Sequence, residues 1–247
     1  MLDLETTGIS AASDRIVEIA VVRTRGLLEI ERWSSLVRPG TPVGASERVH
    51  GISDAMLERA PPLSELRERF ESITRGATLV AHRAPFDLAF LAAASARGEL
   101  ASAPETAIDT AAVAERVLGE SRLAALARRI EGRAPSHRAL PDALAALDAL
   151  AACVEILGPI DAGELVTLSG SRASMRAAVA SVLRQPGPVG IVYRPASGRV
   201  HEDVLDVESV DPPYVTGTLR NKRVRRTLRG DRIVRAWTGE RPALRFF

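Results

Sequence analysis

Four acidic residues and one histidine have the types and spacing needed for divalent-cation chemistry. Asp3 and Glu5 stand two positions apart, Asp87 lies in a second segment, and His137 with Asp142 forms a third. Carboxylates beside apolar residues are rarely buried unless they are paired or bind a metal. The three segments together therefore predict a site for a divalent cation.

The local setting of each group supports this interpretation. Asp3 and Glu5 share one face of an expected strand, because successive side chains alternate between the two faces. The two carboxylates then repel each other unless a cation offsets their charge. Asp142 opens an alanine- and leucine-rich helical run, and His137 precedes it on a loop, where a histidine can take a proton without binding metal.

Taken together, these segments resemble the DEDDh group of 3′–5′ exonucleases, which includes the proofreading epsilon subunits of DNA polymerase III. Asp3 and Glu5 match the first motif, Asp87 the second, and His137 with Asp142 the third, in the order of the family. The resemblance covers roughly the first 155 residues, and the joint occurrence of these motifs is far more specific than any single one. The other matching stretches are residues 15–20, 49–52 and 108–110.

The resemblance implies an α/β fold of the ribonuclease H-like type, with a mixed sheet flanked by helices. It also implies two Mg²⁺ or Mn²⁺ ions held by the four carboxylates, with His137 as the general base on the attacking water. The implied substrate is the 3′ end of single-stranded DNA or RNA, and the product is a nucleoside 5′-monophosphate. A DNA polymerase is a candidate partner, in proofreading or repair. The residues expected to contact the substrate are Thr6, Thr7, Gly8, His82 and Arg83.

Each residue taken alone also has a structural interpretation. Asp142 would be an ordinary N-cap, since aspartate is favoured where a helix begins. Asp87 would be a solvated position on an amphipathic helix, and His137 a surface histidine. His82 is more often a packing or hydrogen-bonding residue than a ligand, and a single cysteine disfavours zinc. Only the joint occurrence of five positions in one order favours the metal-dependent nuclease.

Two features depart from the family pattern. Arg83 stands where the family usually has asparagine after the histidine of the second motif. Only Met1 and Leu2 precede the first carboxylate, whereas the first strand of the family starts several residues earlier. We therefore expect that a few apolar residues added before Met1 would lengthen a central strand and raise the melting temperature.

Length and composition are those of a globular protein with one large domain or two small ones, since 46% of the 247 residues are hydrophobic. No apolar stretch approaches the roughly 20 residues needed to cross a bilayer, and no signal pattern is present, so we expect a cytoplasmic protein without a membrane partner. Residues 1–155 carry 18 arginines against 22 acidic residues, whereas residues 156–247 carry 15 basic against 9 acidic residues. The basic second half predicts a polyanionic partner.

Stretches typical of strands and helices alternate in the first half of the chain. Strands are expected at 16–23, 27–37 and 78–82, and helices at 53–57, 63–73, 86–94, 111–118, 122–130 and 143–157. The predicted organisation is an exonuclease-like domain at 1–157, a linker at 158–170, and a small basic β-rich domain at 171–247. This last domain is expected to begin with a helix at 171–184 and to continue with short strands.

The second half faintly resembles WYL-type domains, small β modules of bacterial regulators, with Tyr214-Val215-Thr216 in place of the three-residue signature. A basic run follows, and its arginines could contact nucleic-acid phosphates. The alternative is a charged strand edge that protects the sheet against aggregation. The candidate nucleic-acid-binding residues are Arg220, Lys222, Arg223, Arg225, Arg226 and Arg229.

The sequence thus favours a metal-dependent 3′–5′ exonuclease whose second domain holds nucleic acid or senses a ligand. The alternative is a nucleic-acid- or ligand-binding regulatory protein, in which the short first strand and Arg83 leave the nuclease fold catalytically weak. Because a two-ion site gains stability from bound metal, a thermal shift with Mn²⁺ separates the two hypotheses.

Overall fold

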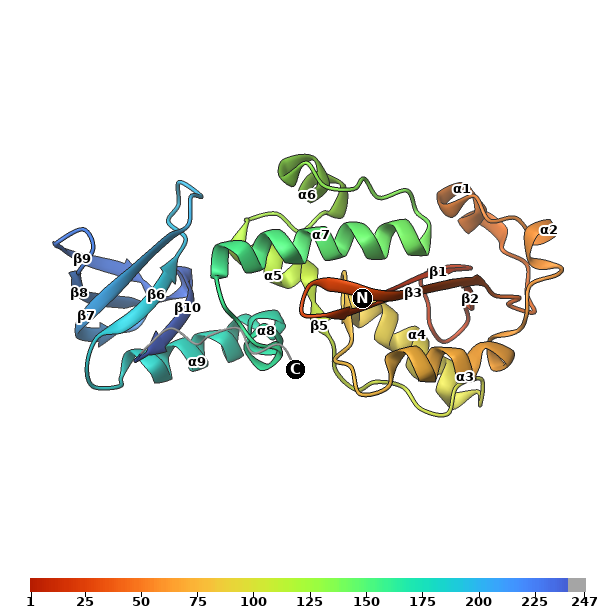
Figure 1. Cartoon of the computed structure of the whole chain (residues 1–247), viewed down its shortest axis with the longest axis horizontal. Helices are drawn as coiled ribbons and strands as arrows, with labels where there is room; N and C mark the ends of the chain where they lie inside the picture. The colour runs from red at the N-terminus through yellow and green to blue at the C-terminus, as the bar shows by residue number, and fades with distance from the viewer. Residues whose placement is uncertain (240–247) are drawn as a thin grey trace. The chain divides into compact units, whose positions relative to one another are not determined.

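A computed structural model describes residues 1–239, apart from the side chains of residues 172–175. The chain divides into two compact units, which Figure 1 shows with their helices and strands labelled. Within the described residues, the first unit comprises Met1–Ala111 and Arg122–Ala151, and the second comprises Ala112–Ser121 and residues 152–239.

The segment expected to be a linker contains a helix. Within residues 158–170 the chain forms α8 (Ala162–Ser169), which begins with a capping box. Asp161 accepts a hydrogen bond from the Glu164 N–H at 2.9 Å, and the Glu164 side chain accepts one from the Asp161 N–H at 3.3 Å. These bonds satisfy N–H groups that a helix start leaves unpaired. The domain limits remain predictions, and residues 240–247 of the expected second domain lie outside the described residues.

A five-stranded mixed sheet forms the centre of the first unit. Its strands are β1 (Leu2–Thr6), β2 (Ile16–Arg25), β3 (Leu28–Leu36), β4 (Val80–Ala81) and β5 (Ile108–Asp109), in the order β3-β2-β1-β4-β5. The central strand β1 pairs antiparallel with β2 and parallel with β4, and β4 pairs parallel with β5. The predicted mixed α/β sheet is therefore confirmed.

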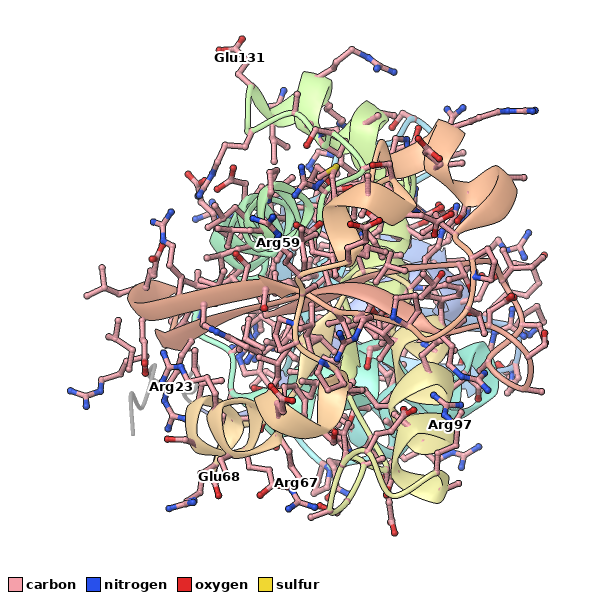
Figure 2. The ribbon with its side chains drawn as sticks, turned by 90° about the vertical axis from the view of Figure 1, so that its right-hand side faces the viewer. Arg23, Arg59, Arg67, Glu68, Arg97 and Glu131 are labelled. Carbon is pink, nitrogen blue, oxygen red and sulfur yellow. The ribbon has the colours of Figure 1, made fainter. Side chains whose placement is uncertain are left out.

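Helices lie on both faces of this sheet. In Figure 1, α3 (Leu63–Thr74) and α4 (Ala84–Ala96) lie below the strands, and α7 (Ala139–Leu157), whose last turns pass into the second unit, lies above them. Arg67 and Glu68 of α3 point away from the sheet (Figure 2), as the polar face of an amphipathic helix does. The other helices of this unit are η1 (Gly44–Ser46), α1 (Glu47–His50), α2 (Asp54–Leu57) and α6 (Leu123–Ile130).

A core between β1 and the two lower helices holds these layers together. Leu2 and Leu4 of β1 are 0% and 5% exposed and belong to the same buried cluster as Phe90 of α4. Burial of each such side chain stabilises the fold by about 1.5–3 kcal/mol. Arg23 of β2, labelled in Figure 2, donates a hydrogen bond to the Ile73 carbonyl at the end of α3 at 2.6 Å. With its leucines buried, β1 must direct its intervening residues to the opposite face.

The second unit contains a separate antiparallel sheet, which confirms the predicted smaller β-rich part. Its strands are β6 (Val189–Tyr193), β7 (His201–Asp211), β8 (Tyr214–Leu219), β9 (Val224–Arg229) and β10 (Ile233–Thr238), in the order β10-β6-β7-β8-β9. Val179 and Leu183 of α9 (Arg172–Leu183) pack into the core of this sheet with Leu205. A 3-10 helix, η2 (Gly230–Arg232), precedes β10, and α5 (Thr110–Val117) enters this unit from the first.

No single helix within residues 1–239 is long and apolar enough to cross a membrane, although α7 and α8, taken together as a bent pair, meet the criteria of length and composition.

Candidate active site

The central strand carries two of the predicted carboxylates. Along β1, Leu2, Leu4 and Thr6 are buried, whereas Asp3 and Glu5 are partly exposed. This alternation follows from strand geometry, in which every second side chain faces the same side. Because β1 lies in the middle of the sheet, both carboxylates stand over its centre and not at an edge.

Asp142 joins these two carboxylates in space. One carboxylate oxygen from each of Asp3, Glu5 and Asp142 lies within 4.8 Å of the others. The pKa of Asp3 lies well above its usual range. Burial is the largest cause, and the negative charges of neighbouring carboxylates, chiefly Asp87, add to it. Burial, and then the charges of Asp142 and Glu18, raise the pKa of Glu5 to about 7. A divalent cation would offset this repulsion, and carboxylate oxygens are the ligands that Mg²⁺ and Mn²⁺ prefer. The three side chains therefore fit a divalent metal.

Asp87 lies beside this group, in the first turn of α4. It is only 3% exposed, which contradicts the alternative of a solvated surface position. Burial is the main cause that raises the pKa of Asp87 to about 8, and hydrogen bonds from its own N–H and from the Leu4 N–H act in the opposite direction. Asp87 also acts on the carboxylates of β1, since its charge raises the pKa of Asp3 and the charge of Glu5 raises the pKa of Asp87. The fourth predicted carboxylate thus faces the same region.

The start of α7 differs from the prediction. The helix begins at Ala139 and not at 143, so Asp142 stands inside its first turn and is not its N-cap. The Asp142 N–H donates to the Arg138 carbonyl at 3.0 Å, and Pro141 is tolerated because first-turn N–H groups have no helical acceptor. The Asp142 carboxylate, 8% exposed, accepts a hydrogen bond from the Ser136 N–H at 2.7 Å. It therefore also holds the loop that leads into the helix.

An ion pair that sequence reasoning missed anchors the same loop. Glu18 of β2, 5% exposed and directly opposite Glu5, accepts hydrogen bonds from Arg138 at 2.7 and 3.1 Å. It also accepts one from the Ala139 N–H at 2.8 Å. The Glu18 hydrogen bond raises the pKa of Arg138. This pair fixes the segment that carries His137 against the sheet, and its one sequence signal is a single acid inside an apolar strand.

His137 lies two residues before α7 in an exposed position. Its backbone has a φ of +55°, in the left-handed region that non-glycine residues rarely adopt. The hydrogen bond from Ser136 and the ion pair of Arg138 hold the chain on both sides of it. Strain of this kind is often retained at functional sites. The exposed imidazole is free to exchange protons with solvent.

The turn after β1 uses its own hydroxyl groups. Thr6 Oγ1 donates to the Gly8 carbonyl at 2.6 Å, and Thr7 Oγ1 accepts a hydrogen bond from the Arg15 N–H at 3.0 Å. A Cβ on Gly8 would lie 2.5 Å from the Asp14 carboxylate, so a larger residue there would displace the Asp14 side chain, which accepts a hydrogen bond from the Ser10 N–H at 2.8 Å. The predicted substrate contacts of Thr6, Thr7 and Gly8 stay predictions, since the structure shows these groups engaged within the turn.

His82 and Arg83 connect β4 to α4. His82 Nδ1 forms a hydrogen bond with Thr110 Oγ1 at 3.0 Å. This bond agrees with the alternative in which His82 is a hydrogen-bonding residue of the fold. The Arg83 N–H donates to Asp109 at 2.9 Å, and Arg83 has φ +64° and ψ +48°, with its side chain exposed. Asparagine adopts this left-handed conformation more readily than arginine, which is a physical reason for the family's preference at this position. Substrate binding by either residue stays a prediction.

The predicted nucleic-acid-binding run lies on and around β9, at one edge of the second sheet. Three of its six residues form ion pairs with acidic side chains, while Lys222, Arg223 and Arg226 are exposed. The pairs are Arg220 with Asp206 at 2.7 Å, Arg225 with Glu208 at 2.7 Å and Arg229 with Asp231 at 2.8 Å. This pattern agrees with the alternative of a charged edge, and nucleic-acid binding by these residues stays a prediction.

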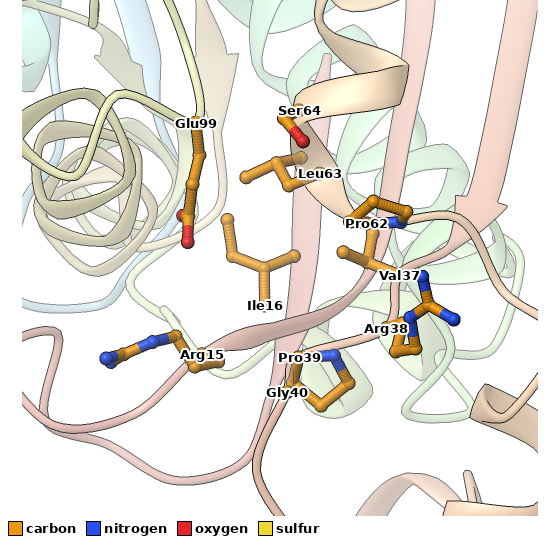
Figure 3. A pocket seen from close by; sticks show the side chains of 10 residues that line it. All are labelled: Arg15, Ile16, Val37, Arg38, Pro39, Gly40, Pro62, Leu63, Ser64 and Glu99. Atoms are coloured by element: carbon orange, nitrogen blue, oxygen red, sulfur yellow. The ribbon is translucent and has the colours of Figure 1, made fainter.

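A separate hollow of about 240 Å³ in the first unit differs from the carboxylate site. Figure 3 shows the apolar side chains of Ile16, Val37 and Leu63 in its wall, together with the charged Arg15 and Glu99. None of the five predicted catalytic residues lines it. The predicted catalytic residues and this hollow are therefore separate features of the first unit.

Comparison with known proteins shows the family of the chain. Residues 1–150 match the RNase T family, described as exonucleases. The chain belongs to this exonuclease family. The matched residues include all five members of the predicted catalytic set.

The relatives of this exonuclease-family chain include proteins named for DNA polymerase III. It is 35% identical over 189 residues to a DNA polymerase III subunit epsilon-like protein of Rhodobacter capsulatus, which covers 71% of this chain and 26% of that protein. It is 33% identical over 147 residues to a PolC-type DNA polymerase III of Bacillus cereus, which covers 58% of this chain and 10% of that protein. The chain thus spans about a quarter or less of the length of these relatives.

Solved exonuclease structures resemble the fold. Exonuclease X in complex with 5′ overhanging duplex DNA superposes with a TM-score of 0.55 at 27% identity, over 68% of this chain and 98% of that chain. Exonuclease I of E. coli in complex with a dT13 oligonucleotide superposes with a TM-score of 0.56 over 88% of this chain and 54% of that chain. At 15% identity, the second likeness supports the fold alone.

Proposed function

We propose that this chain is a divalent-metal-dependent 3′–5′ exonuclease that shortens single-stranded DNA or RNA from its 3′ end. The observation that carries this proposal is the group of carboxylate oxygens from Asp3, Glu5 and Asp142 within 4.8 Å of one another, beside the buried Asp87. The epsilon-like and PolC-type relatives support a role in proofreading or repair beside a DNA polymerase in the cytoplasm.

The four carboxylates would hold two Mg²⁺ or Mn²⁺ ions, which when bound offset charge on the scissile phosphate and lower the pKa of a bound water. His137 accepts the proton that the attacking water loses and passes it to solvent, since its ring is exposed. Water oxygen forms a bond to phosphorus while the bond from phosphorus to the 3′ oxygen breaks. The leaving 3′ oxygen takes a proton from solvent, so the shortened strand ends in a 3′ hydroxyl and the released terminal residue is a nucleoside 5′-monophosphate.

The rigid supports of these groups make the geometry reproducible. Asp3 and Glu5 are carried by a central strand, Asp87 by the first turn of α4, and Asp142 by the first turn of α7. Arg83 is exposed at the N-terminal end of α4, close in sequence to Asp87, and is proposed to contact a phosphate of the bound strand. The site therefore joins metal ligands and a phosphate contact.

Digestion of 5′-labelled single-stranded DNA and RNA in Mn²⁺, Mg²⁺ or EDTA tests this function. We expect stepwise shortening from the 3′ end that EDTA abolishes. Asp142→Asn should lower the rate at least about a hundredfold, because even weakened support of a metal ligand costs tenfold to a hundredfold. Glu68→Gln, an exposed change on α3, is the matched control and should keep the full rate. No shortening in either metal, with oligonucleotide binding retained, would instead favour the regulatory binding protein.

A further inference from the structure

The second unit contains a hollow of about 350 Å³ that is lined largely by arginines. It lies between the end of α5, the turn that follows β6, α9 and the start of β10. Four guanidinium groups share this space with only two carboxylates, so the hollow carries an excess of positive charge. The charged residues that line it are Glu115, Arg116, Arg176, Arg194, Asp231 and Arg232.

One of the two carboxylates is already engaged from outside the hollow. Asp231 accepts hydrogen bonds from Arg229 at 3.1 and 2.8 Å, and its contact with Arg176 is longer, at 3.5 Å. The Arg229 hydrogen bond also lowers the pKa of Asp231. In the part of the chain that the structure describes, Arg194 and Arg232 form no salt bridge. Asp231 therefore interacts most strongly with Arg229 and more weakly with Arg176 and Arg232, and one carboxylate cannot neutralise all of these arginines.

The backbone holds the arginines in place. The Arg194 N–H donates to the Arg232 carbonyl at 2.9 Å, which joins the turn after β6 to the start of β10. The Arg194 guanidinium lies directly against Gly119, where a Cβ would collide with Nη1. Arg116 donates a hydrogen bond to the Gly170 carbonyl at 2.5 Å. Groups that are positioned before a ligand arrives lose less conformational entropy when it binds.

We propose that this arginine hollow binds a phosphate group, either of a free nucleotide or of a polynucleotide backbone. Planar guanidinium groups match phosphate oxygens in pairs, and several of them together favour an anion of charge greater than one. The volume lies at the lower end of the range for small-molecule sites and suits one nucleotide. The arginines on and around β9 are weaker candidates, because Asp206 and Glu208 already pair with Arg220 and Arg225.

A competing structural explanation concerns Arg194 alone. Its guanidinium lies against Gly119, just past the C-terminal end of α5, where a cation stabilises the helix dipole. That role accounts for Arg194 but not for Arg232 or Arg176, which lie on other elements. Substitution of these two separates helix stabilisation from ligand binding.

The test uses the full chain in EDTA, so that binding is measured without metal and without digestion. Three probes are used: inorganic phosphate, a nucleoside 5′-monophosphate, and a fluorescein-labelled single-stranded oligonucleotide. The variants are Arg194→Gln/Arg232→Gln, which removes two charges, and the exposed Arg176→Gln, which removes one. Arg184→Gln, just after α9 and outside the hollow, is the control for the loss of one charge. Calorimetry measures the first two probes and fluorescence anisotropy the third.

We expect the double variant to bind at least about tenfold more weakly, equivalent to about 1.4 kcal/mol, and Arg176→Gln about threefold more weakly. The control should stay within about twofold of the wild type. Loss of mononucleotide binding identifies a free nucleotide as the ligand, and loss of oligonucleotide binding alone identifies a polynucleotide backbone. For the backbone, the dependence of log K on log salt should also fall by about one per lost phosphate contact.

The proposal is overturned if wild type binds none of the three probes, or if the variants bind as tightly as the control. If the double variant melts at a lower temperature, Arg176→Gln decides, because its exposed side chain does not support the fold. Since no measurement requires digestion, failure here is distinguishable from failure of the proposed exonuclease activity.

Discussion

Replacing Glu5 with glutamine removes one charge from the carboxylate group and keeps its shape, and we expect this change to stabilise the metal-free protein at pH 8. Burial, and then the charges of Asp142 and Glu18, raise the pKa of Glu5 from 4.5 to about 7. A carboxyl group whose pKa is higher in the folded state binds its proton more tightly there than in the unfolded chain. Stability is therefore lost as the pH rises from about 4.5 through 7, and the loss is complete near pH 8.

The size of this loss follows from the shift. The rise in the pKa of Glu5 from 4.5 to about 7 corresponds to a loss of at most about 3.4 kcal/mol in the free energy of unfolding, at about 1.4 kcal/mol per pKa unit. Solvent screens the charge of the partly exposed Glu5, so we expect about 1–2 kcal/mol. For a chain of this size, that free energy corresponds to roughly 2–8 °C in melting temperature.

The assay is thermal unfolding followed by circular dichroism, in EDTA at pH 5 and pH 8 and then with Mn²⁺. Glu5→Gln should melt above the wild type at pH 8 and close to it at pH 5, where Glu5 is protonated. Mn²⁺ should reverse the order, because it stabilises the wild type and the variant lacks one ligand. Glu68→Gln on α3 is the control (Figure 2). Equal melting temperatures of Glu5→Gln and wild type at pH 8 in EDTA would refute the reasoning, as would an equal Mn²⁺ response.

Three further substitutions test the supports of the site. Arg138→Gln leaves the buried Glu18 without its charged partner. Because Arg138 is partly exposed, we expect the free energy of unfolding to fall by about 1–3 kcal/mol and digestion to become slower. A double-mutant cycle with Glu18→Gln, measured by urea unfolding, gives the coupling between the two side chains, and additive effects would contradict the ion pair. Asparagine adopts the left-handed backbone of Arg83 with less strain, so Arg83→Asn should raise the free energy of unfolding by about 0.5–1 kcal/mol. An unchanged melting temperature would show that the arginine is not strained. Gly8→Ala brings a methyl group to 2.5 Å from the Asp14 carboxylate, and we expect this side chain to move and lose its hydrogen bond from the Ser10 N–H, at a cost of about 0.5–1.5 kcal/mol. A variant as stable as the wild type would contradict this packing.

Local patterns predicted most elements of the chain correctly. The apolar run at 16–23 is the strand β2 (Ile16–Arg25), and the periodic stretch at 63–73 is the helix α3 (Leu63–Thr74). The start of α7 was predicted too late because Pro141 and the polar residues before it show no helical periodicity. A first turn needs no such pattern, since its N–H groups have no helical acceptors. The helix α8 was missed although Asp161 and Glu164 form a capping box, because the break before it favoured a linker.

Which residues of the basic run pair with acidic side chains could not be predicted from the sequence. The residues of this run count equally as positive charges in the sequence. In the structure, acidic side chains of β7 pair with two of these residues: Asp206 with Arg220 and Glu208 with Arg225. The sequence does not predict that the arginines of the hollow meet, because Arg116, Arg194 and Arg232 are far apart along the chain.

By itself, the sequence determined the chemistry available to this protein and its local geometry. The spacing of Asp3 and Glu5 sets a shared face on any strand, since side chains alternate with a period of two. Only the tertiary structure decided which groups meet. It brought Asp142 within 4.8 Å of that pair and joined Glu18 to Arg138 across 120 residues. Such contacts depend on the order of the strands and on which side chains the fold brings close together. A local sequence pattern encodes neither property.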